Sequence, residues 1–240
     1  MNKVEVFRAL HRRRAQDDPL VLPGPWDAAG ARVFVEAGFP ALATPSAGVA
    51  ASLGYDDGST PADEMFAAVA RITRAVDVPV SADIESGYGL APKELVERLL
   101  EAGAVGCNLE DSAGGVLKDP REQAEFLAEF REAAAGRLFL NARVDVFLHG
   151  DKNPEKAIER AAAYVAAGAD CVYPIFAPAD VLPLLRAGIQ VPININARPD
   201  GEGPSSAELG ELGATRITFG PGLQRMATAA LREIAGSLVR

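Results

Sequence analysis

Acidic side chains alternate with apolar ones in residues 79–89, which have the sequence Pro-Val-Ser-Ala-Asp-Ile-Glu-Ser-Gly-Tyr-Gly. The β-branched residues at its start favour a strand. Because side chains alternate across a strand, Asp83 and Glu85 share one face and the apolar residues beside them share the other. Two carboxylates on one face of a buried strand need a cation between them. Taken alone, the segment also suits an edge strand with a solvated acidic face.

The same alternation recurs in two later segments. Asn108 and Glu110 share one face of a further predicted strand, and Arg143 and Asp145 share one face of the next. Together with Asp83, these carboxylates outnumber the single guanidinium, and the surplus negative charge favours a bound cation. Since all the candidate ligands are oxygen atoms, the sequence predicts Mg²⁺, with Mn²⁺ as the alternative ion. Arg143 then suits a planar carboxylate of the substrate. An interior salt-bridge network without metal is the competing interpretation.

Strands and helices alternate along the chain and predict how these side chains are positioned. The predicted strands cover residues 20–22, 41–44, 78–85, 105–110, 138–146, 171–176, 191–196 and 215–219. A helix follows each strand, and eight such units predict an α/β fold in which residues 1–240 form a single (β/α)₈ TIM-barrel domain. Chemistry is then expected at the carboxyl ends of the strands. A doubly wound open sheet is the alternative, but no Gly-x-Gly-x-x-Gly follows the first strand.

Other residues are assigned by their place in these predicted elements. Residues 45–58, after the second strand, are predicted to form a loop of small residues. Trp26, at the end of the first strand, is expected in the pocket wall, and Asn194 in the seventh strand is expected at the pocket floor. His11 is expected at the surface, and Cys107 is expected to be a buried strand residue, as is the other cysteine.

Composition excludes several classes of partner. The 240 residues are 48% hydrophobic and 24% charged, as is typical of a globular protein, and the net charge of −9 argues against nucleic acid or an anionic membrane surface. We find no apolar run long enough to cross a membrane, and the N-terminal residues lack the apolar core of a signal peptide. A cytoplasmic enzyme is therefore expected.

Four motifs together resemble the isocitrate lyase/phosphoenolpyruvate mutase superfamily, over about residues 22–219. They are Ala-Thr-Pro-Ser-Ala-Gly-Val-Ala-Ala-Ser-Leu-Gly-Tyr-Asp-Asp-Gly at 43–58, Ala-Asp-Ile-Glu-Ser-Gly-Tyr-Gly at 82–89, Leu-Glu-Asp at 109–111 and Asn-Ala-Arg-Val-Asp at 141–145. The resemblance implies a Mg²⁺ ion held directly by Asp83. It also implies that Glu85 and Glu110 act behind Asp83, largely through water.

The resemblance further implies where a 2-oxo acid binds. Its carboxylate would lie against Ser46, Ala47 and Gly48, where small residues let the backbone approach closely, and would also contact Arg143. An aspartate in the same segment takes part in the chemistry of some members; alignment points to Asp57, with Asp56 as the alternative. The resemblance also implies a homodimer or homotetramer in which subunits exchange the eighth helix, predicted over residues 222–238.

The implied chemistry is cleavage of a bond next to a metal-stabilised enolate. Carbon–carbon lyases of this superfamily carry a Lys-x-Cys-Gly-His segment after the fourth strand, whereas residues 111–120 here contain neither Cys nor His. Isocitrate or methylisocitrate cleavage is therefore not expected. The sequence favours a carbon–carbon lyase or decarboxylase that acts on a small 2-oxo acid. The alternatives are carbon–phosphorus chemistry, as in a phosphonomutase or phosphonopyruvate hydrolase, and a 2-oxo-acid-binding protein with little turnover.

Overall fold

The computed structural model describes residues 2–12 and 18–239, and within these ranges eight parallel strands form the inner wall of the molecule. These strands are β1 (Leu20–Val21), β2 (Leu42–Ala43), β3 (Val80–Asp83), β4 (Gly106–Leu109), β7 (Phe139–Val144), β8 (Cys171–Pro174), β9 (Asn194–Asn196) and β10 (Arg216–Thr218). Two parallel ladders connect them in the orders β2-β3-β4-β7-β8 and β1-β10-β9.

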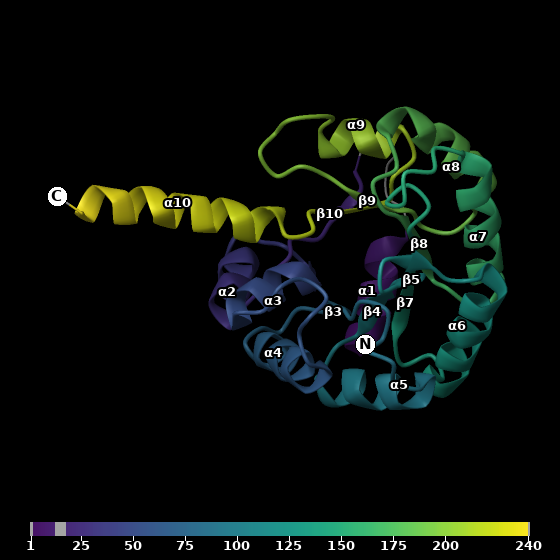
Figure 1. Cartoon of the computed structure of the whole chain (residues 1–240), viewed down its shortest axis with the longest axis horizontal. Helices are drawn as coiled ribbons and strands as arrows, with labels where there is room; N and C mark the ends of the chain where they lie inside the picture. The colour runs from purple at the N-terminus through teal and green to yellow at the C-terminus, as the bar shows by residue number, and fades with distance from the viewer. Residues whose placement is uncertain (1, 13–17, 240) are drawn as a thin grey trace.

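Two further contacts join these ladders into a ring. A parallel bridge pairs Val172 of β8 with Ile193, which directly precedes β9. On the other side, the backbone N–H of Ala43 in β2 donates to the carbonyl oxygen of Pro23, shortly after β1 (3.1 Å). The strands therefore follow each other around a barrel (Figure 1). The predicted TIM-barrel fold is confirmed, and the open sheet is excluded.

Helices surround the strands and cover their outer faces (Figure 1). The outer ring contains α2 (Ala28–Glu36), α4 (Ala62–Arg74), α5 (Pro92–Glu101), α6 (Pro120–Ala134), α7 (Pro154–Ala166), a 3₁₀ turn η1 (Ala179–Val181) continuing into α8 (Leu182–Gly188), and α9 (Ser206–Glu211). Helix α4 shows why they pack this way: Met65, Val69 and Ile72 recur at helical spacing and are fully buried. None of the described helices is long and apolar enough to cross a membrane.

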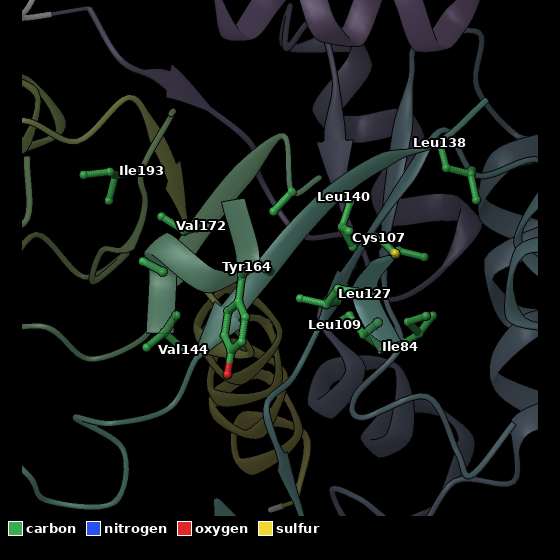
Figure 2. Packing of buried hydrophobic residues seen from close by; sticks show 14 of the residues in the cluster. Ile84, Cys107, Leu109, Leu127, Leu138, Leu140, Val144, Tyr164, Val172 and Ile193 are labelled. Carbon is green, nitrogen blue, oxygen red and sulfur yellow. The ribbon is translucent and has the colours of Figure 1, made fainter. Parts of the chain in front are cut away.

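The outward-facing strand residues pack against this ring. Figure 2 shows Leu109 and Leu140 of neighbouring strands with Leu127 of α6 and Tyr164 of α7, all fully buried. Cys107 belongs to the same cluster, which confirms its expected burial. Because the apolar face of each strand is used here, the polar residues that alternate with it must face the barrel axis.

Helix α1 (Lys3–His11) covers the end of the barrel at which the strands begin. Phe7 packs edge-on against Phe139 of β7, with ring centroids 5.1 Å apart. His11 stacks on the same ring at 4.2 Å and is buried, so its predicted surface position is wrong. Burial, followed by the charge of Arg216, lowers the pKa of His11 to about 3. The amphipathic pattern of α1 alone does not show that the barrel covers the C-terminal end of this helix, where His11 lies.

The segment after β2 also differs from its prediction. Residues predicted as loop contain helix α3 (Ser46–Leu53), which ends at Gly54 in the left-handed conformation (φ 89°). The alanines of this segment favour a helix, although small residues in general also suit a loop. Gly54 suits the end of the helix because glycine readily adopts the left-handed conformation. The site therefore begins at a helix N-terminus rather than in a loop.

Candidate active site

Asp83 ends β3 and faces the barrel axis. Its Oδ2 accepts hydrogen bonds from the backbone N–H (3.3 Å) and the hydroxyl (2.9 Å) of Ser46 at the start of α3. Its Oδ1 is buried and has no hydrogen-bond partner among the described residues. Burial raises the pKa of the Asp83 carboxyl, while the charge of Arg143 and the bonds from Ser46 act in the opposite direction. One carboxylate oxygen is thus oriented by the protein, and the other is available to a ligand.

The turn that follows β3 holds two more polar groups in strained positions. Glu85 and Tyr88 have positive φ values of 51° and 55°, which cost non-glycine residues about 1–3 kcal/mol each. Glu85 Oε1 and the Tyr88 hydroxyl are buried without a hydrogen-bond partner in the described part of the chain. Burial, and then the charges of Asp83 and Asp57, raises the pKa of Glu85 to about 7. Backbone strain combined with unpaired polar atoms is typical of a functional site.

Arg143 of β7 links the remaining predicted carboxylates. Its Nε donates to Asp145 Oδ1 (2.5 Å), its second terminal nitrogen donates to Asp145 Oδ2 (3.3 Å), and its first forms an ion pair with Glu110. The Asp145 side chain is completely buried. Burial opposes the charged form, but the charges of Glu110 and Asp145 outweigh it and raise the pKa of Arg143. The guanidinium is therefore fixed in orientation while it lines the site.

A cavity of about 540 Å³ opens above these residues at the carboxyl ends of the strands. One side of the cavity, called the near side, is formed by β2, β3, β4, β7 and the segment after β2. It is lined by Thr44, Ser46, Ala47, Asp57, Asp83, Asn108 and Arg143. The opposite side, called the far side, is formed by the loop after β7, by β8, β9 and β10 with the loops that follow them, and by the start of α10 (Gly222–Leu238). It is lined by Leu148, Tyr173, Ile175, Phe176, Asn196, Thr218, Phe219, Arg225 and Met226, among others. The cavity thus has a polar near side with two aspartates and Arg143, and a mixed far side in which apolar side chains stand beside Arg198, Asp200 and Arg225. Its size suits a small organic acid.

The chain matches the phosphoenolpyruvate phosphomutase family over residues 7–239. It belongs to this family, within the isocitrate lyase/phosphoenolpyruvate mutase superfamily. An uncharacterized protein of Mycobacterium tuberculosis is 35% identical over 89% of this chain and 81% of its own length. A candidate 2-methylisocitrate lyase of Corynebacterium glutamicum is 29% identical over 96% of this chain and 80% of its own length. A candidate phosphonomutase of Burkholderia cenocepacia has a similar structure, with a TM-score of 0.89 and 40% identity over 98% of this chain and 99% of its own.

The structure of this family member brings five of the predicted site residues to the cavity wall, namely Ser46, Ala47, Asp57, Asp83 and Arg143. Of the two alternative aspartates, Asp57 lines the cavity and Asp56 is absent from its lining. The small-residue motif, recognised by resemblance, and the strand alternation were therefore sufficient to locate this side of the cavity.

Other predicted site residues lie beside or beneath the cavity. Gly48 is buried one residue further along α3, and Trp26 is half-buried against the cluster under α2 and α4. Asn194 is buried in the barrel interior, where its amide donates to the Thr218 hydroxyl (3.1 Å), so it supports the floor through Thr218. Glu85 and Glu110 flank Asp83 from the two loops that follow β3 and β4.

The described residues contain no group of three His, Cys, Asp or Glu side chains close enough to hold one metal ion together. The unpaired oxygens of Asp83 and Glu85 nevertheless fit a hard divalent cation that has one direct protein ligand and keeps several waters. Burial and the charge of Asp83 also raise the pKa of Glu110, although Arg143 acts in the opposite direction. A set of carboxylates whose pKa values are raised together is stabilised by such an ion.

Two groups near the site were missed by sequence reasoning. Asp111 accepts hydrogen bonds from the Asp145 backbone N–H (2.8 Å) and the Tyr164 hydroxyl (2.8 Å), and it is paired with Arg160 (3.1 Å). It thereby holds the backbone that carries the Arg143–Asp145 pair. Its position after a strand was visible in the sequence, but its partners come from two more distant segments.

The second missed group is Arg216 of β10, which is completely buried beneath the cavity. One terminal nitrogen donates to Asn108 Oδ1 (3.4 Å), and its other two nitrogens lack partners among the residues described. Burial lowers the pKa of Arg216. The alternation of Arg216, Ile217 and Thr218 could have revealed its inward direction. With two guanidinium groups instead of the single one predicted, the site keeps a smaller surplus of carboxylates.

The loop after β4 forms a short hairpin of β5 (Ser112–Ala113) and β6 (Val116–Leu117). The Ser112 hydroxyl lies 2.9 Å from His149 Nε2, a contact that connects this hairpin to the loop after β7. The hairpin itself contains no cysteine or histidine. The hairpin therefore supplies neither a thiol nor an imidazole of its own.

Proposed function

We propose that this protein is a Mg²⁺-dependent enzyme that acts on a small 2-oxo acid through its enolate, as a carbon–carbon lyase or decarboxylase. The observation that carries the proposal is the Asp83 carboxylate at the cavity wall, with one oxygen held by Ser46 and the other buried without a partner among the described residues. Asp83 would hold the ion directly, with Glu85 and Glu110 acting through water. When bound, the ion would supply Lewis-acid stabilisation of the developing enolate charge.

The start of α3 supports carboxylate binding. The first N–H groups of a helix have no partner within it, and the helix dipole favours an anion at this end. Ser46 and Ala47 lie in this first turn and line the cavity. Arg143 would contact the same carboxylate from across the site, in an orientation held by Asp145. Asp57, at the cavity rim, would act on the bond that breaks.

The apolar part of the far wall favours carbon–carbon over carbon–phosphorus chemistry. A phosphonate needs cations around it, whereas Leu148, Ile175 and Phe176 are apolar. Two arginines also line the cavity on this side: Arg198 is already paired with Asp200 and Glu202, whereas Arg225 of α10 has no acidic partner among the described residues and favours the alternative. The 40% identity to a candidate phosphonomutase favours the alternative of phosphonomutase or phosphonopyruvate hydrolase chemistry.

Product analysis distinguishes these activities. The protein would be incubated with Mg²⁺ and oxaloacetate, methylisocitrate or phosphonopyruvate, with pyruvate followed by a lactate dehydrogenase assay. Pyruvate from oxaloacetate at a rate above the metal-catalysed background would support the decarboxylase proposal, and pyruvate with phosphate from phosphonopyruvate would support the alternative. Phosphoenolpyruvate from phosphonopyruvate would support a phosphonomutase. Neither pyruvate from any of them nor phosphoenolpyruvate, together with tight oxalate binding, would favour a binding protein. Asp83→Ala should lose Mg²⁺-dependent oxalate binding while keeping its circular dichroism spectrum; retained binding would contradict the metal assignment.

We also propose a homodimer or homotetramer in which α10 (Gly222–Leu238) packs on another subunit. This helix extends away from the barrel, and each of its residues keeps some exposure (Figure 1). Leu231, Ile234 and Leu238 are more than half exposed. Large apolar side chains on one projecting helix favour a covering partner. Whether subunits exchange this helix remains a prediction.

A further inference from the structure

Tyr173 is a cavity-wall residue to which the site described above gives no role. It lies on β8, beside Arg143 in the parallel pairing of β7 with β8. Only 4% of its surface is exposed, and its side chain lines the cavity. It shares the inward face of β8 with Cys171, which is buried deeper in the barrel.

The ring order of the strands places Tyr173 opposite the carboxylate-binding end of the cavity. Counted around the barrel, β8 is the fourth strand from β2, which is half of the circle. The segment that follows β2 carries Ser46 and Ala47. A 2-oxo acid whose carboxylate lies between this segment and Arg143 would direct its other carbon atoms towards β8, the strand next to Arg143. This is the end of the substrate that becomes an enolate carbon.

An enolate released by bond cleavage must receive a proton on carbon. The other ionisable side chains that line the cavity, within the described part of the chain, are carboxylates and arginines: Asp57, Asp83, Arg143, Arg198, Asp200 and Arg225. Asp83 would be ionised as the proposed metal ligand and so has no proton to give; the same holds for any other ionised aspartate, and a guanidinium does not release a proton in a protein. A tyrosine, in contrast, carries its proton at neutral pH. Burial raises the pKa of Tyr173 to about 12, with Thr218 and Arg143 acting in the opposite direction.

We propose that Tyr173 donates the proton that converts the enolate carbon into the methyl or methylene group of the released 2-oxo acid. The electron pair of the enolate forms the new C–H bond as the Oη–H bond breaks, which leaves a phenolate. The Arg143 guanidinium and the Thr218 hydroxyl lie beside this phenolate and stabilise its charge. Water that enters the cavity then returns the proton to the phenolate. This inference rests on the proposed function, since it supplies the donor that the β5–β6 hairpin lacks.

Exchange of the methyl protons of pyruvate in D₂O tests this role, because it runs the same proton transfer in both directions. NMR would follow the exchange with Mg²⁺, while calorimetry would measure oxalate binding. Tyr173→Phe should slow enzyme-catalysed exchange about 100-fold or more, the range of one general acid–base group, and change oxalate affinity by less than about threefold. Tyr55→Phe is the matched control, because its hydroxyl bonds Glu64 outside the cavity; its exchange rate should equal that of the wild type.

The outcomes separate the two proposals. A wild-type protein that fails to bind oxalate with Mg²⁺ overturns the proposed function. A wild-type protein that binds oxalate but does not exchange pyruvate protons, or a Tyr173→Phe variant that exchanges at the wild-type rate, overturns the role of Tyr173 alone. Should Tyr173→Phe misfold, the wild-type chain can be made with 3,5-difluorotyrosine, whose phenol is more acidic. Because the phenolate takes the proton from pyruvate, exchange by the wild type should rise with pH; with the more acidic phenol this rise should move to lower pH, and an unmoved rise counts against Tyr173.

Discussion

Glu85 should couple Mg²⁺ binding to proton release. Its carboxyl has a pKa of about 7, raised by burial and by the charges of Asp83 and Asp57, so close to half of the molecules carry the proton at pH 7. A metal ion needs the ionised form, whether it binds Glu85 directly or through water. Binding at pH 7 should therefore release about 0.5 proton from Glu85. Because the ionised fraction of Glu85 falls about tenfold between pH 8 and pH 6, Mg²⁺ affinity should fall about tenfold over the same range.

The assay is calorimetry of Mg²⁺ binding in two buffers of different ionisation enthalpy, because the difference in measured heat counts the protons released. Glu85→Gln should release about 0.5 proton fewer than the wild type at pH 7 and show a weaker dependence of affinity on pH. Glu97→Gln is a control that removes an exposed carboxylate of α5. Equal proton release by the wild type and Glu85→Gln would refute the reasoning and place the titrating carboxylate elsewhere, with Glu110 as the first candidate.

Three further predictions concern stability and assembly. His11 has a folded pKa of about 3 and an unfolded value near 6.5, so the folded state binds fewer protons between these values and loses stability as the pH falls below 6.5. In urea titrations the wild type should therefore lose about 2 kcal/mol more than His11→Phe between pH 8 and pH 5; equal losses would contradict the burial of a neutral His11. Arg143→Met should destabilise the fold by about 3–5 kcal/mol because it leaves the buried Asp145 carboxylate unpaired, and Arg143→Met/Asp145→Leu should recover much of this loss. If the double variant were destabilised by the sum of the Arg143→Met and Asp145→Leu effects, the result would argue against an interaction between the two side chains. Leu231→Asp should convert a dimeric or tetrameric wild type to a smaller species in light scattering, whereas a monomeric wild type would overturn the oligomer proposal.

The fold followed from local signals in the sequence. Alternation of strands and helices predicted the barrel, and alternation of polar and apolar residues within each strand correctly predicted that Asp83 and Arg143 face its axis. These signals are local because side-chain direction depends only on the backbone period and on which face is apolar. The same local composition misled the prediction at α3, where small residues suit both a loop and a helix.

Contacts across the barrel were decided only by the tertiary structure. The sequence showed that Glu110 and Arg143 face inward, but not that they form an ion pair, which depends on the spacing of β4 and β7. Position along the strand likewise decided that Asn194, the first residue of β9, lies beneath the cavity and that Tyr173, the third residue of β8, lies on its wall. His11 is buried because α1 packs against the end of the barrel. Local sequence determines the direction of each side chain, whereas its depth and its partners depend on residues far away in the chain, which only the folded barrel brings together.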